Sequence, residues 1–283
     1  MSKPVCLITG ATDGVGKATA LGLARQGFKV VLAARNPAKA EMTRAEISAA
    51  RGDGDVEVLI GDLTSLNQVH RLAEHFKANH ARLDVLINNA GVMLTRPQVT
   101  EDALEATWQI NYLSAFLLTH LLMNALQVSK QGRIINLSSS VYRLGKLTPE
   151  HTGGDGRYSA FGSYAASKLA MLLFTLQLAE RLKGTTVTAN AVHPGVVRTP
   201  MLTTAEGPFK LLALLAMPFA VSPEKGAGTS VQLASSPDFA TTSGFYWVNG
   251  KPQVVKSAFN EPQARQALWQ RSLDQLQSRG FCT

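Results

Sequence analysis

The feature that most constrains this chain is the regular alternation of short apolar runs with longer helix-like segments. Short apolar runs bounded by turn residues are typical of strands buried on both faces, whereas apolar residues three or four positions apart are typical of amphipathic helices. A β-α-β repeat with fully apolar strands predicts a parallel sheet that helices cover on both sides. We therefore expect an α/β fold.

Seven strands are expected, at Val5–Thr9, Val30–Ala34, Val56–Ile60, Val85–Asn88, Arg133–Leu137, Val187–Val192 and Gly244–Val248. Helices are expected between them, at Gly14–Gln26, Pro37–Ala50, Leu66–His80, Glu101–Leu126, Tyr164–Leu182 and Lys225–Leu233. A length of 283 residues would allow two domains. Because no linker rich in Pro, Gly or Ser divides the sequence, we expect one domain over residues 1–283.

Two segments interrupt this rhythm. Gly145–Ser163 is long and polar, and residues 201–223 form an apolar excursion. Both follow the carboxyl ends of expected strands, which is where open α/β sheets bind ligands. Long loops in compact domains are usually functional, so both segments are candidate walls of a binding pocket.

The composition excludes some classes of function. The chain has 28 Lys and Arg residues against 20 Asp and Glu residues, a net charge of +8, and no segment concentrates the excess. A dispersed excess predicts a solvated basic surface, so no nucleic-acid partner is expected. Ala106–Ser129 is uncharged but carries several polar side chains, and Leu211–Val221 is short and contains Pro218. Neither segment is expected to span a membrane.

The two cysteines, Cys6 and Cys282, lie near opposite ends of the sequence and form neither a metal-ligand spacing nor a disulfide framework. Cys6 lies in an apolar run and is expected in the core. The first residues lead directly into a strand, so no signal peptide is expected. These features favour a cytoplasmic protein in a reducing compartment.

The turn after the first strand is rich in glycine. It reads Gly10-Ala11-Thr12-Asp13-Gly14-Val15-Gly16 and opens a helix. Glycines let a backbone turn tightly and approach a pyrophosphate, and a helix N-terminus supplies N–H groups and a partial positive charge. An ordinary strand-to-helix turn is the alternative, but the β-α-β setting favours a dinucleotide site.

The second strand ends in Ala33-Ala34-Arg35-Asn36. Chains that bind NAD need an acidic residue here for the ribose 2′-hydroxyl, whereas an arginine offers a charged fork to a 2′-phosphate. Arg35 therefore predicts NADP, with NADPH preferred over NADH, and Lys17 would assist. Asp13 argues against a further basic contact at its own position. A surface arginine without this role is the alternative.

Several motifs together resemble the short-chain dehydrogenase/reductase family. They are Gly10-x-x-x-Gly14-x-Gly16, Asp62-Leu63, Asn88-Asn89-Ala90-Gly91, Asn111, Ser138-Ser139-Ser140, Tyr164-x-x-x-Lys168 and Pro194-Gly195, in the family's order over nearly the whole chain. Arg133–Leu182 and His193–Thr199 are most similar to the retinol dehydrogenase-like branch. The resemblance implies a Rossmann-type, doubly wound fold with a seven-stranded parallel sheet, in a single dinucleotide-binding and catalytic domain.

The resemblance also implies roles for individual residues. Asp62 and Leu63 would contact the adenine of the cofactor, and Pro194, Val197 and Thr199 would lie at its nicotinamide end. The expected cofactor-binding residues lie in the glycine turn, at the end of the second strand and in the family motifs. They are Gly10, Thr12, Asp13, Gly14, Val15, Gly16, Arg35, Asn36, Asp62, Leu63, Asn89, Ala90, Gly91, Pro194, Val197 and Thr199.

Two tyrosines stand four positions before a lysine, in Tyr142…Lys146 and Tyr164…Lys168. Residues four apart share a face only in a helix. Gly145 interrupts the first pair, whereas an unbroken apolar pattern continues after Tyr164. We therefore expect Tyr164 and Lys168 to be catalytic, and Tyr142 to pack or to line the pocket.

A tyrosine with a pKa of about 10 is a poor base at neutral pH, and a cation within ~4–6 Å favours its phenolate. Lys168 is therefore expected to lower the pKa of Tyr164. By resemblance, Ser139 would hold the substrate oxygen, and Asn111 would seat a water that links Lys168 to solvent. A buried asparagine that ties down helix backbone is an equal alternative for Asn111. The gap of 25 positions between Ser139 and Tyr164 is long for the family but matches the retinol dehydrogenase-like branch.

The histidines are not expected to hold a metal. His70, His75 and His80 are five positions apart, so they do not align on one helix face and are expected at the surface. His193 lies beside the cofactor motif and is expected to be structural. The sequence shows no cluster with metal-ligand spacing.

The expected pocket walls are apolar and comprise Val92–Leu94, Tyr142, Phe161 and Met201–Phe219. Such walls favour a small lipophilic aldehyde, ketone or alcohol over a sugar or an acid. A weak contact with a membrane surface is an alternative role for the last of these segments.

The expected function is an NADP(H)-dependent transfer of a hydride between the nicotinamide and a carbonyl or alcohol carbon. An NADPH-binding regulatory or scaffold protein is the alternative, although a scaffold has no need of Tyr164. The helices at Ala106–Ser129 and Tyr164–Leu182 pair two copies in many relatives, which implies a homodimer or homotetramer. Burial of both helices within one chain is the alternative.

Overall fold

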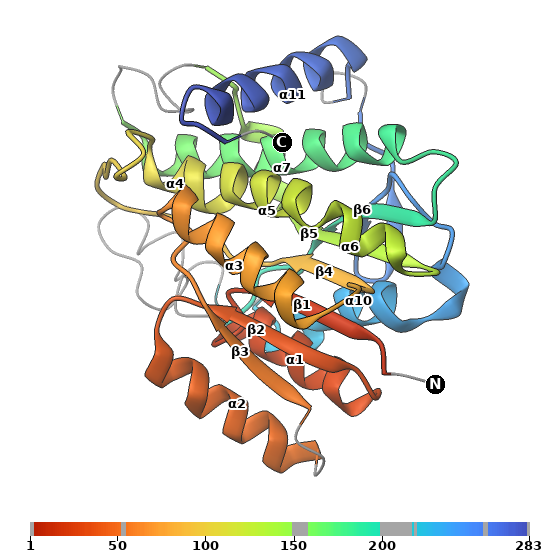
Figure 1. Ribbon diagram of the computed structural model, residues 1–283. Coiled ribbons are helices and arrows are strands. Elements are labelled where there is room, and N and C mark those ends of the chain that lie inside the picture. Colours follow the sequence, from red (N-terminus) through yellow and green to blue (C-terminus); the bar gives the residue numbers. More distant parts are fainter. Residues whose placement is uncertain are drawn as a thin grey trace.

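Within the described residues, which are 3–51, 55–148, 158–198, 217, 220–256 and 260–281, eight strands of this computed structural model form one sheet (Figure 1). The strand order is β3-β2-β1-β4-β5-β6-β7-β8. The strands are β1 (Val5–Thr9), β2 (Lys29–Ala34), β3 (Val56–Ile60), β4 (Val85–Asn88), β5 (Gly132–Leu137), β6 (Val187–His193), β7 (Tyr246–Val248) and β8 (Lys251–Gln253). The predicted seven-stranded parallel sheet is confirmed, and β8 is added to it antiparallel to β7.

β8 is not predicted from its own residues because all of them are polar or proline and all are exposed. Proline is confined to edge strands and bulges, so Pro252 argues against a strand when it is met in a sequence. The turn before β8 carries the missing signal. Asn249 and Gly250 both have positive φ, 50° and 72°, as a two-residue hairpin turn requires, and Asn-Gly is the strongest short hairpin signal.

The sheet grows in opposite directions from its centre. β1 pairs with β2 on one side and with β4 on the other, so the connections that follow β1 and β4 lead away from each other. In open α/β sheets this reversal leaves a crevice at the carboxyl ends of the strands. The glycine turn follows β1 and Asn89–Gly91 follows β4, so the topology brings both motifs to that crevice.

Helices cover both faces of the sheet (Figure 1). They are α1 (Gly14–Arg25), α2 (Pro37–Arg51), α3 (Leu66–Asn79), α4 (Ala106–Trp108), η1 (Gln109–Leu113), α5 (Ser114–Leu121), α6 (Met123–Val128), η2 (Ser140–Leu144), α7 (Ala160–Arg181), α10 (Pro223–Ser235), η5 (Pro237–Phe239) and α11 (Pro262–Gln277). Cys6 and Ile8 of β1 pack in a core with α1, α2 and α10, whereas Val5 and Leu7 pack in the core with α3, α5 and α7. The predicted burial of Cys6 is confirmed.

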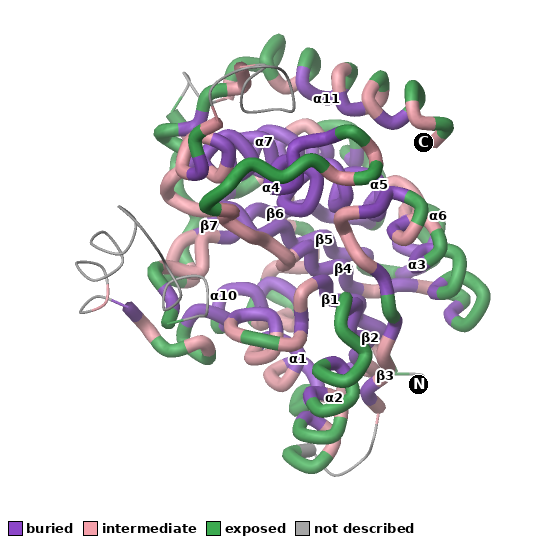
Figure 2. The backbone as a smooth tube through the Cα atoms, turned by 90° about the vertical axis from the view of Figure 1, so that its left-hand side faces the viewer, coloured by how far each residue is buried: buried purple, intermediate pink, exposed green. Residues whose placement is uncertain are grey.

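The uncharged segment Ala106–Ser129 does not form one continuous helix. It consists of α4, the π-helical turn η1, α5 and α6. Figure 2 shows that α4, α5 and α7 are largely buried, whereas α2 is largely exposed. No helix in the described part of the chain is both long enough and apolar enough to cross a bilayer.

α11 packs across the outside of α5 and α7 (Figure 1). The Trp269 ring lies 5.1 Å from the Phe116 ring and 5.9 Å from the Phe174 ring, measured between centroids. The hydroxyls of Tyr112 and Ser272 share a hydrogen bond of 2.6 Å. These contacts bury the face of α5 and α7 within one chain, which is the second of the two alternatives considered for these helices.

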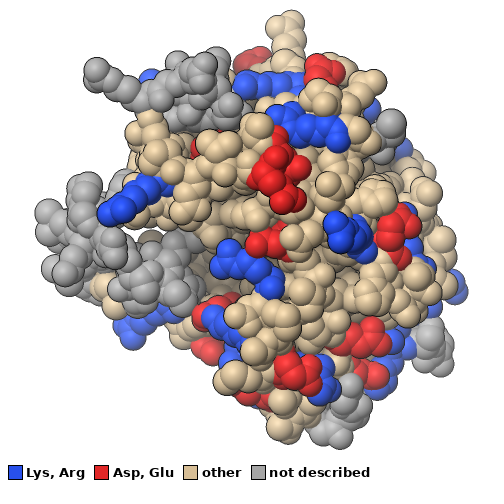
Figure 3. Space-filling view, turned by 60° about the vertical axis from the view of Figure 1, so that its left-hand side comes forward, with Lys and Arg blue, Asp and Glu red and all other residues tan. Residues whose placement is uncertain are grey.

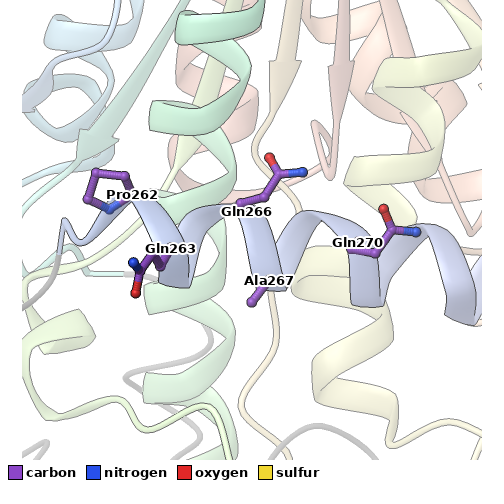
Figure 4. A pocket seen from close by; sticks show the side chains of 5 residues that line it. All are labelled: Pro262, Gln263, Gln266, Ala267 and Gln270. Carbon is purple, nitrogen blue, oxygen red and sulfur yellow. The ribbon is translucent and has the colours of Figure 1, made fainter.

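The outer face of α11 carries a shallow depression, lined by Pro262, Gln263, Gln266, Ala267 and Gln270 (Figure 4). All of these residues are exposed, and none of them was a candidate site residue. The depression belongs to the surface that α11 presents to solvent, while Leu268, Trp269 and Leu276 on the other side of the helix are buried.

One prediction of a surface position is wrong. His80 is buried at the end of α3, where its ring stacks on Phe76 at 4.6 Å and its Nε2 lies 2.9 Å from the Glu57 carboxylate. Helix periodicity compares only residues of the same helix. It therefore cannot reveal that β3 brings Glu57 against the end of α3. His75 is exposed as predicted, and His70 is partly exposed.

Candidate active site

Three glycines shape the turn between β1 and α1. Gly10 and Gly14 have positive φ, 64° and 48°, which glycine adopts without strain. A Cβ added at Gly10 would lie 2.9 Å from Cα of Ala90, and one at Gly16 would lie 2.4 Å from Nδ2 of Asn89. A side chain at either position would therefore collide with the loop after β4. The turn and the loop after β4 can touch because Gly10 and Gly16 have no side chain.

Hydrogen bonds join the same two loops. The backbone N–H groups of Asn89 and Ala90 donate to Oγ1 of Thr9 at 3.0 and 3.1 Å. The Asn89 amide donates to the carbonyls of Thr9 and Gly10 at 2.8 and 3.1 Å. The structure thus brings the glycine turn together with Asn89 and Ala90. Thr9 is missing from the sequence prediction because a threonine at the end of a strand carries no distinguishing signal.

Asp13 has two partners at the start of α1. Its Oδ1 accepts a hydrogen bond from the Gly14 N–H at 2.8 Å, and its Oδ2 forms an ion pair with Nζ of Lys39 at 2.6 Å. Burial raises the pKa of Asp13, but Lys39, the Gly14 N–H and Lys17 outweigh this effect and lower the pKa overall. Asp13 is therefore a carboxylate at neutral pH. Asp13 itself offers no cation to a cofactor phosphate, and the basic side chain beside it is Lys39 of α2.

Lys39 is the residue of this region that sequence reasoning misses. It lies on the first turn of α2, four positions after Arg35. That spacing from the candidate phosphate-binding arginine, at the start of a helix, is the signal that could have found it.

Arg35 and Asn36 follow β2 and are both exposed. Arg35 has no ion-pair partner among the residues that the structure describes. Asn36 accepts a hydrogen bond from the Lys39 N–H at 3.0 Å and therefore caps α2. The cap orients the first turn of α2, so Asn36 has a structural role whether or not it touches a cofactor.

Asp62 and Leu63 follow β3, the next strand beyond β2. Oδ1 of Asp62 accepts a hydrogen bond from the Thr64 N–H at 2.9 Å, and the Leu63 carbonyl accepts one from Ser114 of α5 at 2.7 Å. Both residues follow the strand beside β2, which carries Arg35 at its end, and their contact with the adenine stays a prediction.

The expected nicotinamide end lies after β6. Gly195 has a φ of 88°, which turns the chain, and Pro194 is partly buried. Val197 packs with Val15 of α1 and Ala227 of α10 in a small apolar cluster. Val15 and Val197, two expected cofactor residues, are therefore neighbours. Thr199 and most of the 201–223 excursion lie outside the described residues.

The residues expected to be catalytic converge beside the end of β5. Ser139 lies close enough to Tyr164 to lower the pKa of its phenol, and Nζ of Lys168 lies 5.6 Å from the centre of the Tyr164 ring. Nζ of Lys168 also donates to the Leu137 carbonyl at 2.9 Å. Lys168 is buried and Tyr164 partly buried. A hydroxyl pair with an ammonium beside it is therefore present in the folded chain.

Local structure places each of these groups. Ser159 caps α7 by accepting a hydrogen bond from the Gly162 N–H at 3.1 Å, so Tyr164 and Lys168 stand one turn apart near the start of a long helix. Ser138 donates to the Lys168 carbonyl at 2.8 Å. This bond gives Ser138 a structural role and leaves Ser139 as the serine of the site.

Tyr142 does not compete for this role. It lies in η2 and is 1% exposed, with its ring edge-on to the Tyr246 ring at 5.1 Å. The prediction that Tyr142 packs, and does not share a helix with Lys146, is confirmed.

Asn111 lies in the π-helical turn η1 and is fully buried. Its Oδ1 accepts from the Val92 N–H at 2.7 Å, and its Nδ2 lies 2.8 Å from the Val92 carbonyl and 3.0 Å from Oγ of Ser167. These bonds tie the loop after β4 to α7. The backbone that Asn111 holds belongs to the loop after β4 and not to a helix, so both expected roles of Asn111 stay predictions. π-turns inside helices occur frequently at functional sites.

Gly91 separates Asn111 from Lys168. A Cβ at this position would lie 3.2 Å from Nζ of Lys168 and 3.6 Å from Oδ1 of Asn111. The missing side chain therefore keeps the space beside the ammonium free. The glycine turn, the exposed Arg35 and the loop that carries Gly91 all follow neighbouring strands at their carboxyl ends, which is where a phosphate-bearing dinucleotide binds in open α/β sheets.

Burial dominates the proton affinities of the site. It raises the pKa of Tyr164 to about 12, against a smaller lowering by the Ser139 hydrogen bond, and it lowers the pKa of Lys168 to about 8. Burial, followed by the cations Arg143 and Lys168, lowers the pKa of His193 to about 4. The expected lowering of the Tyr164 pKa by Lys168 is therefore wrong for the chain by itself, because removal from water disfavours the charged forms of both groups.

The walls near this centre are partly apolar. Val92, Met93, Leu94 and Phe161 are partly buried. The Tyr158 hydroxyl donates to the Leu94 carbonyl at 2.6 Å and so connects the segment before α7 to the loop after β4. The expected wall at Met201–Phe219 lies almost entirely outside the described residues.

The described residues contain no group of three or more side chains that could hold a metal ion. Figure 3 shows basic and acidic side chains interspersed on one face of the molecule. This distribution is typical of a solvated surface.

Comparison with known proteins adds an independent finding. Residues 4–207 match the family model for short chain dehydrogenases. Retinol dehydrogenase 12 of Mus musculus is 40% identical over 272 residues, which cover 96% of this chain and 86% of the relative. Polyprenol dehydrogenase of Homo sapiens is 35% identical over 277 residues, which cover 95% of this chain and 84% of the relative.

Solved structures agree with these relatives. A crystal structure of an uncharacterized protein from Mycobacterium paratuberculosis has a TM-score of 0.76 and 30% identity, and the match covers 97% of this chain and 93% of that one. A short chain dehydrogenase from Shigella flexneri, complexed with NADP, has a TM-score of 0.70 and 27% identity over 89% of this chain and 98% of that one.

Proposed function

This chain belongs to the short-chain dehydrogenase/reductase family of oxidoreductases, where it is retinol dehydrogenase-like. We propose that it transfers a hydride between NADP(H) and the carbonyl or alcohol carbon of a lipophilic substrate. The observation that carries the proposal is the meeting of Ser139, Tyr164 and Lys168 at the end of β5. A fold alone does not imply a function, but a hydroxyl pair beside a buried ammonium is the apparatus for moving one proton.

When bound, the nicotinamide cofactor supplies or accepts the hydride. The chain itself handles one proton at the substrate oxygen. With a pKa of about 12, Tyr164 keeps its proton at neutral pH and is suited to donate it to a carbonyl oxygen. The Ser139 hydroxyl donates a hydrogen bond to the carbonyl oxygen of the substrate, and the Lys168 ammonium lies 5.6 Å from the centre of the Tyr164 ring, beside the phenolate that remains. The same residues would accept the proton in the reverse direction, the oxidation of an alcohol.

NADPH is the proposed cofactor form. Arg35 at the end of β2 is a cation where an NAD-binding chain would need a carboxylate. The glycine turn after β1, where a side chain at Gly10 or Gly16 would collide with the loop after β4, supports a dinucleotide at this end of the sheet. The NADP complex of the Shigella flexneri relative supports the same assignment by similarity.

A lipophilic carbonyl or alcohol is the proposed substrate class. The partly buried walls at Val92–Leu94 and Phe161 carry no charge. The relatives named retinol dehydrogenase and polyprenol dehydrogenase support the same class, since both names refer to lipophilic alcohols.

The proposal is tested by NADPH consumption with a panel of carbonyl compounds that includes retinal, medium-chain aldehydes and ketones. Tyr164→Phe is expected to lower kcat by at least about a hundredfold, because it removes the proton donor. Tyr246→Phe is the matched control, since the buried Tyr246 hydroxyl has no hydrogen-bond partner among the described residues.

Full activity of Tyr164→Phe would show that another residue donates the proton. If the wild type binds NADPH but reduces no member of the panel, the NADPH-binding regulatory or scaffold function is favoured instead.

A further inference from the structure

Asp102 joins two elements of the candidate site and has no part in the function described so far. We propose that Asp102 is a positioning residue, which holds the start of α3, next to the expected adenine contacts, and the turn η1, which carries Asn111, in one fixed arrangement. The inference rests on the proposed function and adds to it a residue that acts through its neighbours.

One oxygen of Asp102 accepts hydrogen bonds from two different elements. Its Oδ2 accepts from the Leu66 N–H at 2.8 Å and from the Gln109 side-chain amide at 2.7 Å. Leu66 is the first residue of α3, and Gln109 is the first residue of η1. A carboxylate suits this place because it only accepts hydrogen bonds, and because the first N–H groups of a helix have no partner within that helix.

On one side, Asp102 leads to the expected adenine contacts. Gln68 lies in the first turn of α3, and its side-chain carbonyl accepts from the Asp62 N–H at 3.0 Å. Ser65, the cap of α3, donates from its hydroxyl to Glu101, the residue before Asp102. The start of α3 and the loop that carries Asp62 are therefore fixed against the segment that carries Asp102.

On the other side, Asp102 leads to Tyr164. Asn111 follows Gln109 by two positions in η1, and its Nδ2 lies 3.0 Å from Oγ of Ser167. That hydroxyl donates to the Tyr164 carbonyl at 2.7 Å. A continuous series of hydrogen bonds and helical turns therefore joins Asp102 to the backbone of the proposed proton donor.

The backbone around Asp102 is held in place as well. Its carbonyl accepts from Nε of Arg279 at 2.6 Å, so the segment after α11 supports it from outside. The next residue, Ala103, has a φ of 55°, which is uncommon for a residue other than glycine, and its N–H donates to the Thr100 carbonyl at 3.0 Å. Such strain persists only where the surrounding structure fixes the backbone. The place of the Asp102 carboxylate is therefore set by the fold around it.

Two substitutions separate the two bonds of Asp102. Asp102→Asn keeps the shape of the side chain, but a neutral amide oxygen accepts both bonds less strongly than a carboxylate does. Gln109→Met removes only the bond to η1 and leaves the bond between Asp102 and the Leu66 N–H in place. The first variant therefore loosens both ends of the site, and the second loosens the catalytic end alone.

The first test is steady-state kinetics with NADPH and the best carbonyl compound of the panel. Asp102→Asn is expected to lower kcat about tenfold and to raise the KM for NADPH about threefold, because small displacements of catalytic and binding groups are costly in rate. Gln109→Met is expected to lower kcat by a similar factor and to leave the KM for NADPH unchanged.

Asp84→Asn is the matched control. Asp84 is also a partly buried carboxylate that joins separate segments, since it accepts from the Val5 N–H at 2.7 Å and from Oγ of Ser129 at 2.6 Å, but it lies at the amino end of β4. This variant is expected to lower the melting temperature and to leave kcat and KM unchanged. If Asp102→Asn also lowers only the melting temperature, its role is purely structural and the inference is overturned.

The second test does not depend on catalysis. Amide hydrogen exchange of residues 109–113 is measured by mass spectrometry with and without saturating 5′-AMP, a fragment that lacks the nicotinamide half of the cofactor. In the wild type, 5′-AMP is expected to slow this exchange at least about twofold, because segments that open together share the stabilisation by a ligand that binds one of them. The effect is expected to disappear in Asp102→Asn and to remain in Asp84→Asn.

The outcomes separate this inference from the proposed function. If the wild type reduces no carbonyl compound, the proposed function fails, and hydrogen exchange still decides whether Asp102 links the two ends. If the wild type is active but 5′-AMP does not slow exchange in residues 109–113, or slows it equally in Asp102→Asn, the proposed function stands and the role of Asp102 is overturned.

Discussion

At the scale of single residues, Gly91 shows how an absent side chain can shape a reaction site. Its backbone passes between Asn111 and Lys168, and any Cβ there would come within 3.2 Å of the Lys168 ammonium. No positive φ is recorded at this position, so the requirement for glycine comes from the neighbouring ammonium and not from the backbone.

Gly91→Ala is expected to lower kcat about tenfold and to change the melting temperature little. The added methyl group would push the Lys168 ammonium from its place, and displacement of a catalytic group by about 1 Å can cost up to about a hundredfold in rate. Steady-state kinetics and thermal unfolding of the same preparation measure the two effects. Gly228→Ala on α10 is the matched control, because a Cβ there meets nothing within 4 Å. An unchanged kcat for Gly91→Ala would mean that Lys168 tolerates the displacement.

The choice between the two tyrosines is also made at the residue scale, and the sequence suffices for it. Gly145 interrupts the segment after Tyr142, whereas the pattern after Tyr164 is helical over its whole length. The pKa of Tyr164 is a different matter. This pKa depends on how far the folded chain buries the Tyr164 hydroxyl away from water, and the sequence alone does not give that burial.

At the scale of elements, the π-helical turn η1 decides what Asn111 can reach. A π-turn accommodates an extra residue and changes the direction of the side chains around it. Here it sets Asn111 between Val92 and Ser167, with which it makes its hydrogen bonds. The uncharged pattern of Ala106–Ser129 predicts burial correctly but cannot locate such a turn, because every residue of η1 is buried and no polar face marks its position.

α11 is the element whose packing can be tested most directly. Trp269→Ala is expected to lower the free energy of unfolding by about 3–5 kcal/mol, since a buried tryptophan leaves a large cavity. Its ring contacts Phe116 and Phe174, so the loss would also uncover the apolar face of α5 and α7. Urea unfolding measures the stability, and size-exclusion chromatography shows whether the uncovered face associates.

Gln270→Ala, the next residue on the exposed side of α11 (Figure 4), is the control for this experiment and is expected to change stability by less than about 0.5 kcal/mol. Equal stability of the two variants would contradict the packing of α11 on α5 and α7.

At the scale of the whole molecule, buried histidines make stability depend on pH. Burial lowers the pKa values of His80, His120 and His193 below the ordinary value, to about 4 in the case of His193. The unfolded chain therefore binds more protons than the folded chain once the pH falls below about 6.5, so stability is lost as the pH falls towards the folded pKa values. The loss from His193 alone reaches about 2 kcal/mol at pH 5.

Urea unfolding at pH 7.5 and at pH 5 is expected to show this loss in the wild type and a smaller loss in His193→Gln. His70→Gln is the control, because His70 is partly exposed and the helix around it tolerates glutamine. A pH dependence that is the same in His193→Gln and in the wild type would show that His193 titrates normally in the folded chain.

The order of elements could be read from the sequence almost completely, because strand and helix periodicities are local properties of the backbone. The glycine turn after β1, Arg35 at the end of β2 and the helix that carries Tyr164 and Lys168 could be read for the same reason. Asn249-Gly250 also carries a hairpin signal in the sequence, but the polar residues of β8 do not resemble a strand, so the hairpin was not predicted. α11 was not, since the packing of Trp269 and Ser272 against α5 and α7 involves residues far apart in the sequence.

The sequence by itself thus determined the α/β architecture and the family, and it singled out the candidate site residues, because these follow from periodicity and from motifs within short segments. Only the tertiary structure decided that Lys39 meets Asp13, that Asn111 ties Val92 to Ser167 and that His80 is buried against Glu57. Each of these contacts joins separate elements across the sheet or its crevice. Their energies depend on distance and on the exclusion of water, and both quantities exist only once the chain has folded.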